Sequence, residues 1–447
     1  MKNLKYSVFF KVFTIFIITL LLLIPTSMIH SLISERENTQ NNAIFEVSSK
    51  WGEAQTIQGP FISVPYIKYV KEISKKDSVE RIVQVKEYFH LLPSKLQIQG
   101  ELSPEKRNRS IYEIVVYQTK MQLKGEFDVS EIATLDIPIS NIQWEKAEFV
   151  IGLDDLRGIE EQVDLQWNGS NFSFQPGVSS NDVVSSGIHA DVELNVSDST
   201  KYSFDLNLDI KGSQMLYFTP VGKVTDVSIA SQWATPSFNG AFLPDTREVS
   251  NTGFSANWNV LHLNRNFPQL WVNDRYKMGD ASFGVDLLLP VDSYQKSYRT
   301  IQYAILFIGF TFLVFFFIEV LHKVFIHPIQ YILVGVALVV FFILLLSISE
   351  HLNFNLAFII SAVSTLLLIA GYVKAILKSN LLTVVLTGIL FFLYTFIFVI
   401  IQLEDFALLI GSIGIFIILS VGMYLSRKID WYQLQLGNSV EKYTEND

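Results

Sequence analysis

Acidic residues that neighbour a histidine are the residues of this sequence best suited to chemistry. Glu319 and His322 stand three positions apart, which places a carboxylate and an imidazole on one face of a helix, as in di-metal helical bundles. Such a centre needs about two of these pairs and further carboxylates, and the sequence has no second copy. We therefore expect Glu319 and His322 to mark a membrane boundary, with Pro328 at the start of the next helix.

Two further acidic groups, Glu350-His351 and Glu404-Asp405, lie in short hairpins between apolar runs. Because histidine titrates near neutral pH, they could form a docking surface or a patch that responds to protons or cations. Alternatively, these acids favour helix N-terminal dipoles and occupy the membrane side that Lys and Arg avoid. Both interpretations stay open, and these four residues, with the pair above, are the candidate interaction or sensing residues.

The sequence offers no enzymatic signature. It contains no G-x-S-x-G, no H-E-x-x-H and no glycine-rich phosphate loop. Asp154-Asp155 and Glu160-Glu161 could supply paired carboxylates, but they flank Arg157-Gly158 in what we expect to be a solvated loop. With no cysteine, thiolate catalysis and cysteine metal sites are excluded. We predict no catalytic residue, no metal site and no cofactor.

The candidate residues are positioned by apolar runs that are long enough to cross a membrane. Five of these runs fill residues 301–425 and lie at about 301–318, 329–348, 354–373, 381–401 and 406–425. Each approaches the roughly 20 residues needed to span a hydrocarbon core of about 30 Å. A sixth run at 12–33 is longer than a signal-peptide core of about 7 to 15 residues and lacks a small-residue cleavage site, so we interpret it as an uncleaved anchor.

Charged residues in the connections predict how the chain is inserted. Basic residues gather at one set of connections, at Lys2, Lys5, Lys11, Lys323, Lys374, Lys378, Arg427 and Lys428. The opposite hairpins, 349–354 and 402–405, contain none. Because Lys and Arg favour the cytoplasmic side, and six spans return the chain to its starting side, both termini are expected in the cytoplasm.

Ionisable residues are absent from the five C-terminal spans away from their ends. Ion-coupled transporters usually need such groups within the membrane, so this absence disfavours that class. The spans do contain hydroxyls, which we expect to bond to helix backbones or neighbouring helices rather than to line a pathway. These hydroxyls belong to Ser361, Ser364, Thr365, Thr383, Thr387, Thr395, Ser412 and Ser420.

The intervening residues 34–300 read as a water-facing, β-rich domain. They hold 25 of the 34 Lys and Arg residues and 35 of the 43 Asp and Glu residues, a net charge of −10 in a chain with a total of −9. An acidic domain without a basic cluster repels phosphate backbones, which excludes nucleic acid as a partner. Residues 201–211 alternate apolar and polar side chains, which predicts a half-buried antiparallel strand.

Similar alternation at 188–196, 254–260 and 282–287 predicts two packed sheets or a sandwich. Residues 34–51 are expected to continue the anchor as a helix, and 71–81 to form a solvated loop or hairpin tip. The fold class is thus a membrane protein with six α-helical spans and a β-rich extracytoplasmic domain after the first. The predicted order is cytoplasmic 1–11, anchor 12–33, β-rich 34–300, bundle 301–425 and cytoplasmic tail 426–447.

Several segments resemble a known family, the bacterial inner-membrane proteins called CreD, which are described as cell envelope integrity proteins. The resemblance lies in residues 283–292, 303–309, 327–331, 347–351, 402–409 and 427–432, and upstream in 240–244 and 263–269. It is strongest over 238–432. It implies an inner-membrane location and a link to envelope integrity and to responses to β-lactams and colicins. It implies no established chemistry.

Two classes of function remain compatible with the sequence. The first is a non-enzymatic envelope protein, embedded in membrane lipids, that binds an envelope protein or another envelope component through its extracytoplasmic domain. The second is a transport or lipid-handling protein whose bundle forms a pathway lined by hydroxyls.

Overall fold

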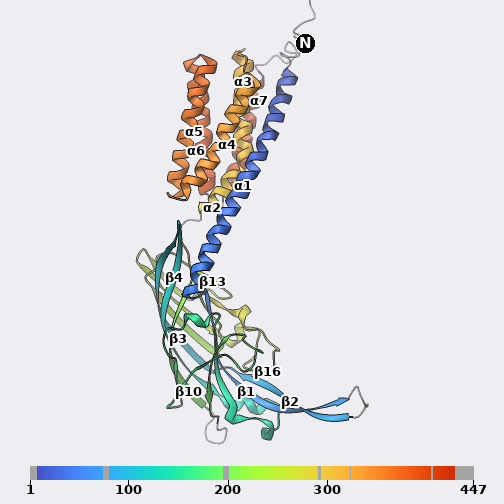
Figure 1. Ribbon diagram of the computed structural model, residues 1–447, viewed down its shortest axis with the longest axis vertical. Coiled ribbons are helices and arrows are strands. Elements are labelled where there is room, and N and C mark those ends of the chain that lie inside the picture. Colours follow the sequence, from blue (N-terminus) through green and yellow to red (C-terminus); the bar gives the residue numbers. More distant parts are fainter. Residues whose placement is uncertain are drawn as a thin grey trace, which may run out of the picture. The chain divides into compact units, whose positions relative to one another are not determined.

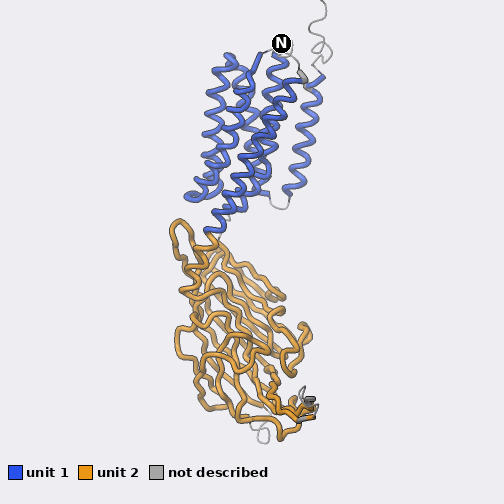
Figure 2. Tube along the Cα trace, turned by 45° about the vertical axis from the view of Figure 1, so that its right-hand side comes forward, with its two compact units in different colours: residues 1–39, 291–447 blue, residues 40–290 orange. Residues whose placement is uncertain are grey.

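The structure analysed is a computed structural model of the chain. It describes residues 8–73, 80–194, 201–289, 293–322, 324–403 and 406–427. The chain divides into two compact units, with residues 1–39 and 291–447 in unit 1 and residues 40–290 in unit 2 (Figure 2). Helix α1 (Val8–Trp51) contributes to both units, which confirms the helical continuation expected after the anchor.

Unit 1 is helical (Figure 1). Its C-terminal helices are α2 (Ser293–Gln302), α3 (Ala304–His322), α4 (Pro328–Ser349), α5 (Phe354–Leu377), α6 (Asn380–Gln402) and α7 (Ala407–Ser426). Six helices of the described ranges, α1 and α3 to α7, are long and apolar enough to cross a membrane, as predicted. Pro328 begins α4 as expected, and the ring of His327 caps it by accepting a hydrogen bond from the Ile329 amide.

One helix was not predicted as a separate element. The apolar pattern placed the first C-terminal span from residue 301, whereas the chain forms the short helix α2 and breaks at Tyr303 before α3. Helix α2 is amphipathic and buries Tyr294, Ser297 and Thr300 on one face. A search for apolar runs misses such a helix because its polar residues lower the mean hydropathy of the segment.

Packing within the bundle depends on small and aromatic residues. A Cβ added at Gly335 of α4 would lie 2.2 Å from Leu22 of α1, so glycine allows these two helices to approach closely. The rings of Phe307, Phe341 and Tyr394 pack at centroid distances of 4.7 to 5.6 Å between α3, α4 and α6. This cluster fills the interior of the bundle.

Half of the eight hydroxyls singled out in the spans bond to their own helix, as expected. The four that donate to the carbonyl three or four residues earlier are Thr383, Thr395, Ser412 and Ser420. Ser361 and Thr387 differ, because their buried hydroxyls have no hydrogen-bond partner among the described residues. These two residues are therefore the ones that favour a polar pathway through the bundle.

Unit 2 consists of two sheets (Figure 1). The nine-stranded sheet runs β13-β17-β11-β1-β5-β9-β8, with β2 paired to β1 and β16 paired to β2. Its strands are β1 (Gln55–Ile73), β2 (Glu80–Leu91), β5 (Ala147–Gly152), β8 (Gln175–Pro176), β9 (Gly187–Val192), β11 (Met215–Phe218), β13 (Pro236–Gly240), β16 (Leu270–Val272) and β17 (Phe283–Leu287).

The eight-stranded sheet runs β14-β15-β12-β3-β4-β10-β6-β7. Its strands are β3 (Lys95–Arg109), β4 (Tyr112–Asp128), β6 (Asp164–Trp167), β7 (Ser170–Ser173), β10 (Lys201–Ser213), β12 (Val224–Ser231), β14 (Thr246–Ser250) and β15 (Gly253–Leu261). The described ends of the 71–81 segment are the ends of β1 and β2, which pair as a hairpin. The rest of the predicted loop or hairpin tip, residues 74–79, lies outside the described residues.

Alternation along the strands builds one shared core. In β10, Tyr202, Phe204 and Leu206 are buried while the residues between them are more exposed, as the alternation predicted. Phe149 of the nine-stranded sheet packs against Phe127 and Phe204 of the eight-stranded sheet at 5.8 and 5.3 Å. Because such aromatic contacts join both inner faces, the two sheets stabilise one another.

The segment 263–269, which carries part of the family resemblance, has a structural role. The buried Arg265 guanidinium donates to the carbonyls of Phe267 at 2.6 Å and Val221 at 3.0 Å, and also to Gln269 Oε1. Gln269 in turn donates to the Pro93 carbonyl at 2.8 Å. Burial lowers the pKa of Arg265 to about 10, still far above neutral pH. These hydrogen bonds therefore join three loops, namely segment 263–269, the loop at Val221 and the loop at Pro93.

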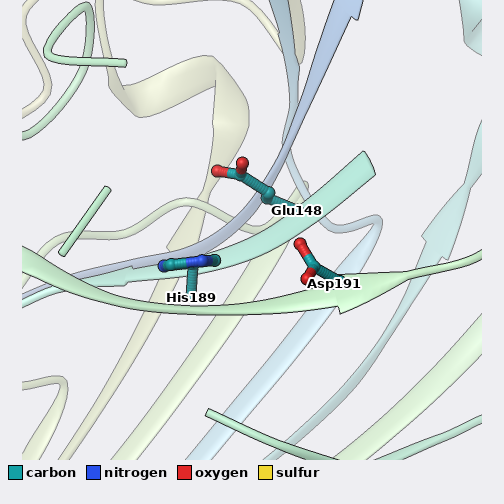
Figure 3. Close-up of side chains that lie close together, drawn as sticks. All are labelled: Glu148, His189 and Asp191. Carbon is teal, nitrogen blue, oxygen red and sulfur yellow. The ribbon is translucent and has the colours of Figure 1, made fainter. Parts of the chain in front are cut away.

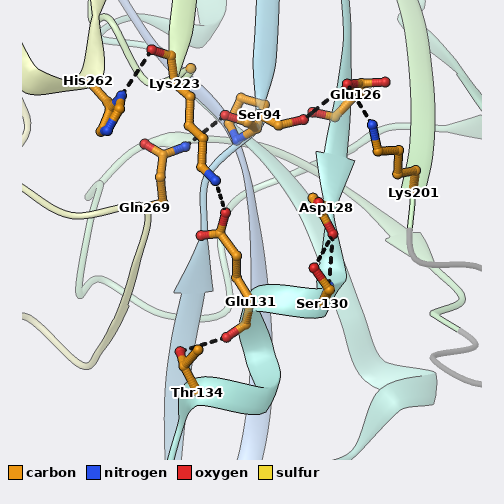
Figure 4. Close-up of polar contacts among 12 residues, drawn as sticks. Ser94, Glu126, Asp128, Ser130, Glu131, Thr134, Lys201, Lys223, His262 and Gln269 are labelled. Carbon is orange, nitrogen blue, oxygen red and sulfur yellow. Dashed lines mark hydrogen bonds and ion pairs between the residues drawn. The ribbon is translucent and has the colours of Figure 1, made fainter.

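Polar contacts close the neighbouring strand ends of the eight-stranded sheet (Figure 4). Lys223, just before β12, forms an ion pair with Glu131, which follows β4. The Lys223 carbonyl lies 3.4 Å from the ring of His262, after β15. Ser94 donates to the Glu126 carbonyl at 3.0 Å, between the start of β3 and the end of β4. These contacts satisfy polar groups where the ladders end.

The loop around Asp154-Asp155 corrects one expectation. It was predicted to be solvated, but Asp155 is buried, and its carboxylate accepts from the Glu53 amide at 3.0 Å and from Arg157 Nε at 2.9 Å. Burial alone would raise the pKa of Asp155, but the Arg157 and backbone hydrogen bonds hold it below the usual value. Arg157 also donates to the Ser49 carbonyl. Hydrogen bonds from this loop therefore hold the end of α1 and the residues that follow it in place within unit 2.

Candidate functional site

Glu319 and His322, which were predicted to act as a pair, have different surroundings in the structure. Glu319 of α3 lies 2.6 Å from Lys11 Nζ of α1 and accepts from the Tyr331 hydroxyl of α4 at 2.9 Å. The two charged side chains are only 12% and 15% exposed, so the pair is largely buried. His322 is exposed. Glu319 thus joins three helices of unit 1, and among the described residues it belongs to no cluster of metal-ligand atoms.

Glu350 has a similar position. Its carboxylate accepts from the Tyr294 hydroxyl of α2 at 3.2 Å and lies 3.6 Å from Arg36 Nε of α1. Its neighbour His351 is exposed. Glu404 and Asp405 lie outside the described residues. The interaction or sensing roles of all these residues stay predictions, while Glu319 and Glu350 also have a clear packing role between α1 and the bundle.

A polar groove crosses the outer face of the eight-stranded sheet and was not predicted from the sequence. Its volume is about 710 Å³. Strand register places two adjacent rows of outward side chains across it. The first row is Asn257, Ser228, Gln99, Gln122 and Asn207, and the second is Ser255, Ala230, Glu101, Lys120 and Asp209.

Short side chains explain the hollow. Ser228, Ala230 and Ser255 stand on the neighbouring strands β12 and β15, beside the longer Gln99 and Glu101 of β3. A face with alternating short and long side chains leaves open volume where the short ones meet. Local sequence patterns do not reveal the groove, because its rows form only when the β3–β4 pair is joined by β10, β12 and β15 from later in the chain.

The groove's chemistry suits polar recognition. Its first row contains only amides and a hydroxyl, which both donate and accept hydrogen bonds. Lys120 Nζ lies 4.0 Å from Asp209, whereas Glu101 and Glu161 form no ion pair with a described residue, so the lining is acidic. No aromatic ring lines it. The arrangement fits a polar ligand with positive charge rather than an apolar small molecule.

A second polar constellation lies on the nine-stranded sheet. Ser63 Oγ is 3.2 Å from His90 Nδ1, and His90 Nε2 is 3.4 Å from Asp182 Oδ2. These residue types are those of nucleophilic hydrolases, and they were missed because no local motif connects them. Ser63 is only 3% exposed and His90 only 1%, so a substrate has no approach to the hydroxyl in this conformation.

Comparison with known proteins matches the chain over nearly its whole length. A family model described as inner membrane protein CreD matches residues 7–432. The inner membrane protein CreD of Escherichia coli (strain K12) is 33% identical over 438 residues, which cover 97% of this chain and 96% of that protein. The match thus extends through the region before residue 178, where the resemblance in the sequence is weaker.

Reversing the charge of Glu319 should destabilise unit 1. Glu319→Lys places two cations together and should cost about 3 kcal/mol or more, as when a buried pair loses a partner. The double variant Lys11→Glu with Glu319→Lys restores the pair and should recover most of this loss. The measurement is the thermal midpoint in detergent, with the exposed His322→Ala as the matched control. Equal destabilisation in the single and double variants would contradict this assignment.

The Asp182 carboxylate should make stability pH-dependent. The hydrogen bond from His90 holds the pKa of Asp182 below its ordinary 3.8. A depressed pKa contributes stability above the unfolded value, and this contribution is lost as pH falls through the folded value. Asp182→Asn should therefore lower the thermal midpoint at pH 7, with the gap to wild type narrowing toward about pH 3.

Thermal melts across this pH range test the prediction. Asp136→Asn, which changes an exposed carboxylate of the same unit, is the control and should follow wild type throughout. Parallel curves for wild type and Asp182→Asn would show that the His90 contact contributes nothing.

Proposed function

Because this chain belongs to the CreD family of inner membrane proteins, we propose that it supports cell envelope integrity by binding a partner, without catalysing a reaction. The chain is an inner membrane protein with several spans. The proposed partner is a polar, basic segment of an envelope protein, held in the groove of the eight-stranded sheet. The observation that carries the proposal is the groove itself, with its acidic and amide-lined rows.

The composition of the groove supports binding rather than catalysis. Its lining residues include no Ser–His or Cys–His pair and no cluster of metal-ligand atoms that could activate a nucleophile. Amide side chains in a row can bond to the backbone of an extended polypeptide, and the unpaired Glu101 and Glu161 attract basic side chains. The buried Ser63 offers no competing reactive hydroxyl at the surface.

The proposed orientation places unit 2 outside the cytoplasm and both termini inside it. The distribution of Lys and Arg among the connections supports it. A partner in the envelope requires this orientation, because a cytoplasmic groove could not meet it.

The rival proposal, a transport or lipid-handling bundle, has one specific observation in its favour. Ser361 and Thr387 are polar side chains of α5 and α6 whose buried hydroxyl oxygens have no hydrogen-bond partner among the described residues. Such groups could line a pathway, although both lie among apolar side chains and neither is ionisable.

Cysteine labelling should test the orientation, since the chain has no native cysteine. Ser170→Cys, exposed at the start of β7, should react with an impermeant thiol reagent in intact spheroplasts. Asn380→Cys, exposed at the start of α6, should react only after permeabilisation. Both variants must react in permeabilised cells, which controls for accessibility. The opposite labelling pattern in intact spheroplasts would refute the orientation.

Filling the groove should abolish function. Ser228→Trp places a large ring in the hollow and should reduce detergent tolerance of a deletion strain to that of the empty vector. Gln97 of β3 points outward from the same sheet but lies outside the groove lining. Gln97→Trp is therefore the matched control and should complement fully. Comparable membrane levels of both proteins are required.

The same assay separates the rival proposal. Ser361→Ala combined with Thr387→Val removes two bundle hydroxyls and should leave tolerance unchanged. If this variant fails to complement while Ser228→Trp succeeds, the binding proposal is wrong and the pathway is favoured.

A further inference from the structure

Three potential metal ligands lie together on the nine-stranded sheet. Glu148 stands on β5, and His189 and Asp191 stand on the neighbouring strand β9, with their side chains on one face of the sheet (Figure 3). One ligand atom from each of the three lies within 4.8 Å of the others. Among the described residues this is the one such group of three.

The two carboxylates of this group lack a counter-charge. Glu148 and Asp191 are direct partners in the antiparallel register, where like charges are destabilising. Neither forms an ion pair with a described residue. Glu148 is only 9% exposed, and its buried Oε2 has no hydrogen-bond partner among the described residues. A buried carboxylate in this state is costly unless a cation accompanies it.

His189 is oriented as a metal ligand. Its Nδ1 lies 2.8 Å from the Gly177 carbonyl. Because a carbonyl only accepts hydrogen bonds, Nδ1 is the donor, and in the neutral ring this leaves Nε2 with its lone pair. A histidine that donates through one nitrogen to a backbone carbonyl and binds metal through the other is the usual arrangement at metal sites.

We propose that Glu148, His189 and Asp191 bind a divalent transition-metal cation, with Zn²⁺ as the probe. Imidazole combined with carboxylates suits such ions, whereas Mg²⁺ prefers oxygen ligands alone. Ligands of tetrahedral zinc are separated by about 3.4 Å, so small side-chain rotations from the present spacing complete the site. The exposed Asp191 provides the entrance, and water fills the remaining position.

The bound ion would act structurally. Strand β9 lies between β5 and the two-residue strand β8 at the end of the sheet order, so β9 has little support on that side. A cation shared by β5 and β9 replaces the repulsion between Glu148 and Asp191 with two attractive bonds. It would therefore hold this end of the sheet together. The inference is independent of the groove and its partner.

Zn²⁺ titration of the purified full-length protein in detergent tests the site. Wild type, stripped with a chelator, should bind about one equivalent and show a raised thermal midpoint, since a ligand that binds only the folded state stabilises it. His189→Ala should weaken Zn²⁺ binding by at least about tenfold, the lower bound for losing even a supporting group of a metal site. Mg²⁺ at the same concentration should produce no shift.

Two further variants make the result decisive. His262→Ala removes an exposed histidine whose Nδ1 also faces a backbone carbonyl, and it should bind Zn²⁺ as wild type does. Glu148→Gln keeps the shape of the side chain, so it should fold but lose the Zn²⁺-dependent shift. Absence of Zn²⁺ binding in wild type, or equal binding in His189→Ala, would overturn the proposal. An equal shift with Mg²⁺ would overturn the metal class.

Discussion

Carboxylates that leave water must be paired, and this constraint determines much of how the chain packs. Glu319 and Glu350 each connect helix α1 to the bundle of unit 1, through Lys11 and Arg36. In unit 2 the buried Asp155 accepts hydrogen bonds from Arg157 and the Glu53 amide, so the end of α1 is held there as well. Glu148 departs from this rule, since its buried Oε2 has no hydrogen-bond partner in the part of the chain that the structure describes. A site that departs from a rule followed elsewhere in the fold is a good candidate for a ligand.

The two sheets share one core but differ in their outer faces. On the eight-stranded sheet the outward residues stay exposed and form the polar groove. On the nine-stranded sheet the row that includes Ser63, His90 and Glu148 is buried. Hydrogen-bond partners reduce the cost of burying a polar row, and His90 accordingly contacts both Ser63 and Asp182. The open face therefore suits the proposed partner, and the proposed cation site lies on the more covered face.

Local patterns predicted the elements, because they depend on side chains close in sequence. The apolar runs of the spans and the alternation of β10 are of this kind. The sites escaped prediction because most of their residues meet only in the folded sheets, through strand pairing and loop contacts. Ser63 and Asp182 belong to segments far apart in the chain, and the groove rows cross five strands. Asp155 was expected in solvent because an acidic loop gives no hint that Arg157 and the Glu53 amide will cover it.

Segment 263–269 and the groove show two different reasons why particular residue types occur at particular positions. Segment 263–269 owes its character to folding, since Arg265 and Gln269 bond to backbone carbonyls. Outward residues of a sheet face no such demand, because the fold requires only that they tolerate water. A row of five uncharged hydrogen-bonding side chains, drawn from five strands and free of Lys or Glu, is therefore not a requirement of the sheet. Its uniform chemistry is better explained by a ligand that lies along it.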